Sequence, residues 1–501
     1  MEKMVGFSWL QKKYGLAGYA LTHQSIIGAR LKQEIDEDNT VIDFYTPLYA
    51  PTDQEDSMLH LEFGIKYDDL NLDFLKAVFA VIPDEAVLAY LSGKPKGSYE
   101  RRVGYLYEFL TGIRLPVPDQ GKGNYIDLLD SSKYITSKGQ NIARWNIRDN
   151  LLGLAQFCPV IRRTKALERL LETDYRQLIT AIRQAFPPDI FYRAVSYLYT
   201  KETRSSYLIE QEQPSPERTA RFISLLERAG EEPIATLMRE QFLTHLQNEI
   251  VDSRFAALGY RNFQNYIGQT TYNFKEIFHY ICPPPQFLPS IMEGLSMSLE
   301  KTAGVHPVVR ATIIAFGFVF AHPFEDGNGR LHRFLIHDVL TRDGVVPRGM
   351  IVPVSAHMVN HKKEYDMALE VYSKPLMRRI RYELNQQDHS LRVTNPEAVE
   401  SYFRYPDLTS QCIYLATTIQ ETIKEDIYPE MEFLVKYDEA KTAIQEIVDM
   451  PDRYIDLLIK LLHQNKGLLS ERKRKHFTQL TDSELSRIET VFREVFPSSN
   501  I

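Results

Sequence analysis

The side chains that could do chemistry are concentrated in one twelve-residue stretch, 322–333, which reads HPFEDGNGRLHR. Gly327 and Gly329 flank Asn328 where a helix is predicted to begin. Without side chains in the way, the backbone N–H groups there can converge on an anion, and the helix dipole adds to the attraction. The stretch therefore predicts a phosphate-binding helix start.

Four charged or titratable side chains accompany this helix start. Arg330 and Arg333 are three residues apart, so they share a helix face and can each fork onto phosphate oxygens. Asp326 offers a hard oxygen ligand for Mg²⁺. His322, whose type titrates near neutrality, can take a proton from a hydroxyl. Each residue alone has an ordinary structural explanation, but together they predict phosphoryl or nucleotidyl transfer.

Two helices must position this loop. Residues 311–320 are apolar on nearly every side, which predicts a buried helix. Pro323 disfavours helical geometry in the residue before it, so this helix should end near His322. The second helix should begin within 328–330 and end at the Asp-Gly pair 343–344.

The rest of the chain is predicted to be mainly α with one small β-hairpin. Aromatic and β-branched residues around a Gly and an Asn predict the hairpin in 263–282, and the prolines at 283–285 should end it. Thr481 and Glu484 form a capping box ahead of a C-terminal helix. Helical spacing or composition is found in 72–82, 85–91, 140–250, 288 to about 390, and from about 396 onward.

Composition bounds the class of protein. The 501 residues, 44% hydrophobic and 25% charged, are typical of a globular chain of about three domains. A net charge of −7 argues against a protein organised to coat nucleic acid. Three widely spaced cysteines predict reduced thiols, and no apolar run is long enough for a signal or a membrane span. We therefore expect a cytoplasmic protein without a membrane partner.

The stretch 322–333 resembles the Fic-family signature H-x-F-x-[DE]-G-N-G-R-x-x-R, with every fixed position matched. Upstream, GYRNFQNYIG and PPPQFLPSIMEGL resemble the family's flap and the helix after it; downstream, HKKEYDMALEVYS resembles the helix that closes its nucleotide pocket. The resemblance implies a Fic helical core with a hairpin flap, flanked by mostly helical regions. It predicts an N-terminal region of unknown role at 1–135, a Fic domain at 136–392, and a C-terminal helical region at 393–501.

What the resemblance implies is adenylylation: transfer of AMP from ATP to a Tyr, Ser or Thr hydroxyl of a protein, itself included. His322 would deprotonate the hydroxyl, and Asp326 would hold Mg²⁺. The flap, near 264–282, would pair with an extended segment of the target by β-augmentation, and Phe324 would pack inward. The nucleotide phosphates would be bound by Gly327, Asn328, Gly329, Arg330 and Arg333.

Other activities stay open. The kinase branch of the family, the Doc toxins, carries Lys where this chain has Gly329, so Gly329 favours AMP transfer. UMP transfer, deAMPylation and nucleotide binding without turnover are alternatives, although an intact His322 argues against the last. Expected partners are ATP and a protein substrate, with nucleic acid disfavoured and a homo-oligomer left open.

The resemblance also implies an inhibitory helix near 203–212, placing the chain in the N-terminally inhibited class. Ser206 to Gln211 resembles the inhibitory pattern [ST]-x-x-x-E-[GN], with Gln211 departing at the last position. Glu210 would pair bidentately with Arg333 and occupy the place of the γ-phosphate. A second candidate, within 290–294, has one residue too few between its Ser and Glu.

Three weaker signals remain. Tyr365 and Tyr372 are seven residues apart, hence on one helix face, and could line an adenine or ribose site or simply pack. His357 and His361 have the spacing of a zinc helix, but the glutamate of H-E-x-x-H is missing, which favours a pair without metal. The basic run 471–476 is expected to be a solvated loop.

Overall fold

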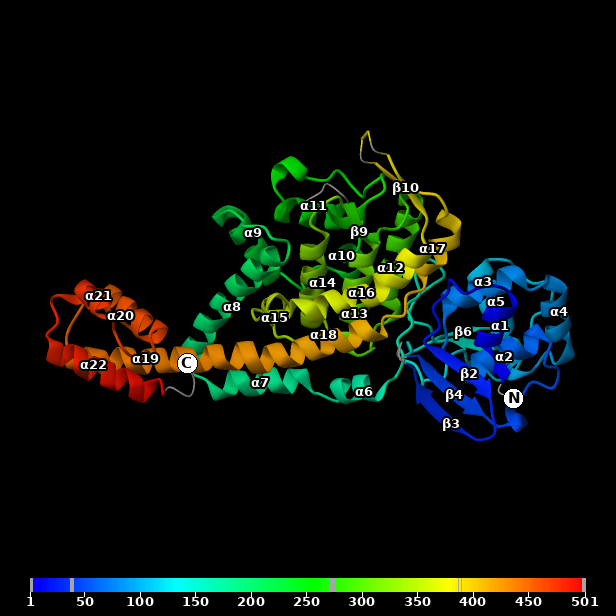
Figure 1. Cartoon of the computed structure of the whole chain (residues 1–501), viewed down its shortest axis with the longest axis horizontal. Coiled ribbons are helices and arrows are strands. Elements are labelled where there is room, and N and C mark those ends of the chain that lie inside the picture. The colour runs from blue at the N-terminus through cyan, green and yellow to red at the C-terminus, as the bar shows by residue number, and fades with distance from the viewer. Residues whose placement is uncertain (1–2, 37–39, 271–275, 386, 389, 498–501) are drawn as a thin grey trace.

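The computed structural model describes residues 3–36, 40–270, 276–385, 387–388 and 390–497. The molecule is elongated, with an N-terminal region at one end, a helical body in the middle and a helical arm at the other end (Figure 1). Helices make up 58% of the chain, which confirms the mainly α expectation. Among the described residues, no helix is long and apolar enough to cross a membrane.

The N-terminal region combines helices with two small mixed sheets and has its own hydrophobic core. Its first sheet has the order β1-β2-β4-β3, in which β2 and β4 are parallel and the outer pairs antiparallel. The second sheet has the order β5-β7-β6. The elements are β1 (Lys3–Val5), α1 (Phe7–Lys13), β2 (His23–Ile27), β3 (Lys32–Ile35), β4 (Val41–Tyr45), η1 (Pro47–Tyr49), α2 (Ser57–Tyr67), α3 (Leu72–Val81), α4 (Asp84–Gly93), α5 (Ser98–Thr111), β5 (Ile126–Asp127), β6 (Gln140–Ile142) and β7 (Ile147–Asp149).

Helices at 72–82 and 85–91 are confirmed by α3 and α4. The helical prediction for 140–250 is wrong at its start, because 140–149 forms β6 and β7 and the first helix begins at Lys165. Strands of three to five residues are too short to show a clear alternation of apolar and polar side chains.

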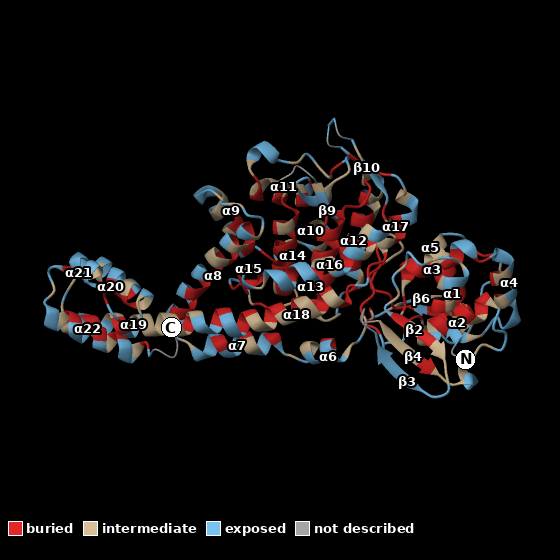
Figure 2. Ribbon diagram, in the orientation of Figure 1, coloured by how far each residue is buried: buried red, intermediate tan, exposed pale blue. Residues whose placement is uncertain are grey.

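At the centre of the body, α12, α14 and α18 pack against α13 (Pro307–Ala321), which is buried from Val308 to its end. Figure 2 shows that the buried residues concentrate in these central helices. The remaining body elements are α6 (Lys165–Leu171), α7 (Tyr175–Ala185), α8 (Pro188–Ile209), α9 (Pro216–Glu227), α10 (Ile234–Leu237), α11 (Glu240–Ile250), η2 (Ser253–Phe255), β8 (Tyr266–Thr270), β9 (Glu276–Ile281), η3 (Pro285–Phe287), α12 (Leu288–Lys301), α14 (Asn328–Arg342), α15 (Val354–Asn360), α16 (Lys362–Arg379), β10 (Tyr382–Leu384), β11 (Leu391–Val393), α17 (Pro396–Arg404) and α18 (Thr409–Thr422).

The predicted hairpin is confirmed as the antiparallel pair β8 and β9, which lies within 263–282. The register shifts between Ile267 and Gly268. β9 ends at Ile281, before the prolines that cannot donate to a ladder. The turn at 271–275 lies outside the described residues.

The C-terminal arm begins where α18 runs through a π-helical turn, η4 (Ile423–Ile427), into α19, so the three make one long helix (Figure 1). The arm has a third hydrophobic core, and the capping box of Thr481 and Glu484 is confirmed. The basic run 471–476 is helical instead of a loop, and Arg474 pairs with Glu489. The arm's helices are α19 (Tyr428–Ile447), α20 (Asp452–Gln464), α21 (Glu471–Arg474), η5 (Lys475–Phe477) and α22 (Asp482–Val495).

The N-terminal region is fastened to the body by buried ion pairs. Arg379 on α16 contacts Asp73 on α3 at 2.6 Å, and both side chains are buried. The Ser401 hydroxyl of α17 donates to the same carboxylate at 2.6 Å. Breaking one partner of such a pair leaves a buried charge uncompensated, so these contacts hold the two parts in one orientation.

All three cysteines are buried and unpaired, which confirms that they form no disulfide. Burial raises the pKa of each thiol to about 12, so each stays protonated. The residues are Cys158, Cys282 and Cys412.

Candidate active site

The loop between α13 and α14 is formed as the sequence predicts. α13 ends at Ala321, and His322 caps it in the left-handed region (φ 49°, ψ 59°), which reverses the chain direction. α14 begins at Asn328 after Gly327, whose φ of 86° favours glycine, and it ends at Arg342. The helix boundaries around the loop are thus confirmed.

Buried contacts hold the loop in a single shape. Phe324 is fully buried, as expected. The Asn328 side chain accepts from the Phe324 N–H at 3.0 Å and donates to its carbonyl at 2.9 Å. These two hydrogen bonds make Asn328 a structural element of the helix start, and its expected contact with phosphate stays a prediction.

Arg261, which was given no role from the sequence, joins the flap to the loop. Its backbone N–H donates to the Pro323 carbonyl, and its guanidinium donates to the carbonyls of His322, Phe263 and Pro283, each at 2.8 Å. Arg261 is buried, and burial lowers its pKa. The only signal in the sequence was an arginine just before the predicted flap. Its backbone partners, which include the Ala321 carbonyl at 3.3 Å, follow only from the fold.

His322 is held as a neutral base. Its Nδ1 lies 3.2 Å from the Val319 carbonyl oxygen. Because a carbonyl only accepts, Nδ1 carries the proton and Nε2 keeps its lone pair. Burial, followed by the charge of Arg261, lowers the pKa of His322 to about 4. The imidazole can therefore accept a proton at Nε2 at any pH near neutrality.

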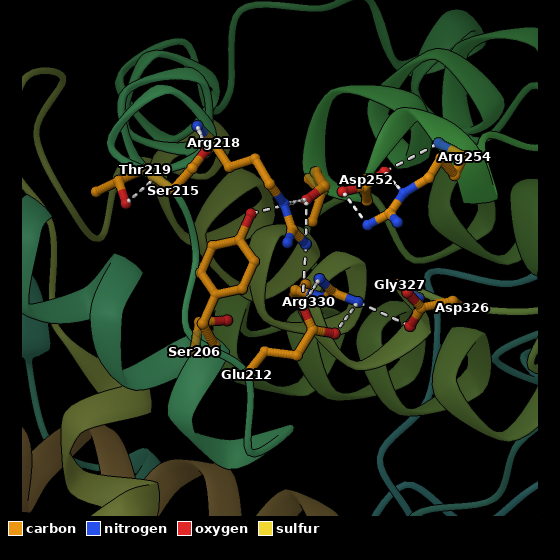
Figure 3. Close-up of polar contacts among 12 residues, drawn as sticks. Ser206, Glu212, Ser215, Arg218, Thr219, Asp252, Arg254, Asp326, Gly327 and Arg330 are labelled. Carbon is orange, nitrogen blue, oxygen red and sulfur yellow. Dashed lines mark hydrogen bonds and ion pairs between the residues drawn. The ribbon is translucent and has the colours of Figure 1, made fainter.

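Arg330 is completely buried and held between two carboxylates (Figure 3). Its Nη2 lies 2.7 Å from Oδ1 of Asp326 and 3.0 Å from Oε1 of Glu212. The guanidinium also lies over the ring of Tyr207, 5.2 Å from its centroid. Glu212 was not singled out from the sequence, because it lies one residue beyond the inhibitory pattern.

Arg333 is also buried, and it contacts both residues of the inhibitory pattern. Its Nε donates to Oγ of Ser206 at 2.8 Å, and its Nη2 donates to Oε1 of Glu210 at 2.8 Å. The expected bidentate pairing is wrong: one carboxylate oxygen contacts one nitrogen, because Ser206 takes Nε. Nη1 of Arg333 is buried and has no hydrogen-bond partner among the described residues.

The Glu210 carboxylate lies directly on Gly329. A Cβ built at Gly329 would collide with Oε1 of Glu210, and Nη1 of Arg333 would be 3.3 Å away. Only glycine leaves room for this carboxylate at the helix start. Glu210 therefore occupies the space where an anion bound to the helix start would lie.

The backbone after Glu210 shows why the pattern has Gly or Asn at the position that Gln211 fills in this chain. Gln211 has a φ of 58°, in the left-handed region that glycine and asparagine adopt readily. The turn carries Glu212 back toward Arg330 through the Glu212 N–H bond to the Tyr207 carbonyl, at 3.0 Å. Gln211 adopts this geometry at the cost of strain.

Asp326 fits the chemistry of a Mg²⁺ ligand. Its side chain is 42% exposed, and its Oδ1 accepts from the Gly327 N–H at 2.6 Å as well as from Arg330. A half-exposed carboxylate beside a helix start can bind an ion that keeps most of its waters and bridges to phosphates.

Residues 237–340, which include the loop, both arginines and the flap, match the model of the Fic/DOC family. This segment is a Fic domain. Over 72 residues the chain is 38% identical to the protein adenylyltransferase fic-1 of Caenorhabditis elegans, across 14% of this chain and 13% of that protein. Over 76 residues it is 36% identical to the protein adenylyltransferase Fic of Drosophila melanogaster, across 15% of each. The similarity to protein adenylyltransferases is thus distant, and the matches span 13–15% of the length of these relatives.

Among solved structures, the chain resembles a Fic family protein from Desulfovibrio desulfuricans G20. The TM-score is 0.38 and the identity 16%, over 63% of this chain and 87% of that one.

The two tyrosines of α16, which lies beyond the segment matched to the family, have different surroundings. Tyr365 is buried beside Arg333, whose charge partly offsets the rise in its pKa caused by burial. Tyr372 stacks on Phe320 with ring centroids 3.9 Å apart, and the Tyr402 hydroxyl donates to its carbonyl. Tyr365 thus lies next to the arginine site, and Tyr372 packs between α16 and α13.

The second candidate for the inhibitory pattern lies on α12, away from the Fic loop. Oγ of Ser290 contacts the Phe287 carbonyl and Arg404, and Glu293 is exposed. In the part of the chain that the structure describes, neither side chain forms a hydrogen bond or ion pair with Arg330 or Arg333. Of the two matches, only the one at 206–211 is brought to the arginines.

Proposed function

We propose that the protein is a protein adenylyltransferase that transfers AMP from ATP to a hydroxyl of a Tyr, Ser or Thr side chain, its own chain included. The observation that carries the proposal is the juxtaposition of a neutral His322 and a helix start facing Arg333, whose buried Nη1 lacks a partner. Activation of a hydroxyl requires a base, and binding of a polyphosphate requires positively charged hydrogen-bond donors.

In the proposed reaction, Nε2 of His322 takes the proton of the target hydroxyl. The hydroxyl oxygen forms a bond to the α-phosphorus of ATP while the bond to the bridging oxygen breaks, and pyrophosphate leaves with that electron pair. Asp326 would hold Mg²⁺, which neutralises negative charge on the phosphates. Backbone N–H groups at Gly327 to Gly329 and the two arginine side chains would orient the phosphates.

The geometry at Gly329 supports AMP transfer over kinase chemistry. A lysine at this position, as in the Doc kinases, would need space that the Glu210 carboxylate fills. The Glu210 carboxylate lies against Gly329 at the start of α14, which supports autoinhibition of the proposed reaction. Glu210 is proposed to be that restraint, because it binds Arg333 where a terminal phosphate would be needed.

The flap is proposed to bind the target protein. β9 packs against α16, whereas among the described residues β8 pairs only with β9, which leaves the outer edge of β8 open there for another strand. Ile267 on β8 is 42% exposed and Ile277 on β9 is 40% exposed. An open strand edge with exposed apolar side chains suits the addition of an extended segment of the target.

The proposed reaction is tested by supplying the purified protein with Mg²⁺ and ATP labelled at either the α- or the γ-phosphate. We expect label from the α-phosphate to become attached to protein, and none from the γ-phosphate. Attachment of the γ-label alone would identify a kinase and overturn the AMP-transfer proposal.

The low pKa of His322 predicts an unusual pH dependence. Because the base is protonated only below about pH 4, kcat/KM at saturating Mg²⁺ should stay level from pH 8 to pH 6 and fall only below about pH 5. An ordinary histidine would lose half of its base form near pH 6.5. Initial rates of α-label transfer measure the profile, and a half-loss near pH 6.5 would contradict the proposed state of His322.

Gln211→Gly is predicted to strengthen the restraint. Glycine removes left-handed strain of about 1 kcal/mol, so the turn that presents Glu210 and Glu212 should become more populated. Basal α-label transfer should fall by up to about five-fold. Gln213→Gly is the matched control, since Gln213 has no positive φ and gains only chain flexibility. Equal rates for both variants and wild type would count against a strained turn.

A further inference from the structure

Three metal-ligand side chains come together outside the Fic loop. His357 lies on α15, His361 is the residue after α15, and Glu425 lies on the π-helical turn η4. One ligand atom from each residue lies within 4.8 Å of the other two. His357 is buried, His361 is partly buried and Glu425 is exposed, so the cluster opens from the protein interior to solvent.

The ring of His361 is already in the tautomer that a metal needs. Its Nδ1 lies 3.1 Å from the His357 carbonyl oxygen, which can only accept, so Nδ1 carries the proton. The lone pair is then on Nε2. A backbone carbonyl that fixes the tautomer in this way is the usual outer partner of a metal-binding histidine. The rings of His357 and His361 stack with centroids 4.0 Å apart, so the two imidazoles lie next to each other.

A second carboxylate contacts the cluster from outside, as an outer partner of His357. Oε2 of Glu421, near the end of α18, lies 3.1 Å from Nε2 of His357. Glu421 and Glu425 are four residues apart, and the π-helical turn between them widens the helix where the histidines face it. Such turns occur frequently at functional sites. The carboxylates of Glu421 and Glu425 together balance the charge of a divalent cation.

We propose that His357, His361 and Glu425 form a binding site for Zn²⁺. Imidazole and carboxylate are ligands of zinc, and three of them with one water satisfy its tetrahedral preference. Glu425 and His361 reach the surface, so their side chains can close onto an ion without rearranging the core.

The site lies where three segments of the chain meet. On α15, the Ser355 N–H donates to Glu202 of α8 at 2.8 Å, and on η4, Asp426 contacts Lys201 of α8 at 2.6 Å. A bound ion would link α15 directly to η4, where the long helix leaves the body for the C-terminal arm (Figure 1). Bound zinc would thus hold the start of the C-terminal arm, at η4, against α15 of the body.

The test is zinc titration of the full-length protein after removal of any affinity tag, with metal content measured following gel filtration. Wild type should retain about one Zn²⁺ per chain, and Co²⁺ in its place should give the visible absorption of a four-coordinate site. His361→Ala and Glu425→Ala should each weaken zinc binding at least ten-fold. His245→Ala, an exposed histidine on α11, should bind zinc as wild type does.

Circular dichroism of each variant shows whether its fold is kept, and both ligand positions reach the surface, so folding should be unaffected. Loss of zinc in the two ligand variants with retention in His245→Ala establishes the site. Zinc content near zero in wild type, or equal content in all variants, overturns it. The Mg²⁺-dependent reaction is not used in this test, so its outcome is separate from that of the proposed function.

Discussion

Glu210→Gly is expected to raise auto-AMPylation at least ten-fold, equivalent to about 1.4 kcal/mol or more. In the folded chain the Glu210 carboxylate contacts Arg333 at 2.8 Å and covers Gly329, so by our proposal it would exclude the terminal phosphate of ATP from this helix start. Removing the carboxylate frees Nη2 of Arg333 to join Nη1 in binding phosphate. Glu210 is the C-terminal cap of α8, outside the helix proper, so glycine there costs little helix stability.

The matched control is Glu231→Gly, which removes an exposed acidic residue from the loop between α9 and α10. Its labelling should equal that of wild type, whereas a rise comparable to that of Glu210→Gly would mean that loss of negative charge alone activates the protein. Equal labelling of wild type and Glu210→Gly would remove the restraint from the account.

His322→Ala, made in the Glu210→Gly background, is expected to lower AMP transfer by at least 100-fold, within the range of general-base catalysis. The alanine removes Nε2, the acceptor for the hydroxyl proton. ATP binding should be kept, because the proposed phosphate contacts are those of the helix start and the arginines, and the loop is held by Arg261, Asn328 and Phe324. The loss should therefore appear in kcat and hardly in the KM for ATP.

Binding of a fluorescent ATP analogue, measured beside α-label transfer, separates the two effects. His245→Ala in the same background serves as the control and should leave both unchanged. Undiminished transfer in His322→Ala would contradict the role of His322, and it would favour a protein that uses another base.

The sequence alone predicted the parts of the site that depend on local geometry. Pro323 and Gly327 end one helix and begin the next, and those constraints act between neighbours, so the helix boundaries could be predicted closely. The resemblance also pointed to Ser206 and Glu210, which the fold brings to Arg333 across more than a hundred residues.

Contacts between distant segments could not be predicted. Arg261 donates to carbonyls of the loop and of both ends of the flap, and Glu212 reaches Arg330 only because Gln211 turns the chain. The N-terminal sheets were missed because strands such as Lys32–Ile35 are exposed along their whole length and carry no buried face.

The most direct test of the central claim is intact-protein mass spectrometry after incubation with ATP and Mg²⁺, comparing wild type, Glu210→Gly, and the double variant Glu210→Gly/His322→Ala. We expect the mass of Glu210→Gly to increase by that of an AMP group, the mass of wild type to change little, and the mass of the double variant to stay the same. If the mass of Glu210→Gly is unchanged and no added protein is modified, or if the gain is a single phosphate, the protein does not transfer AMP as proposed.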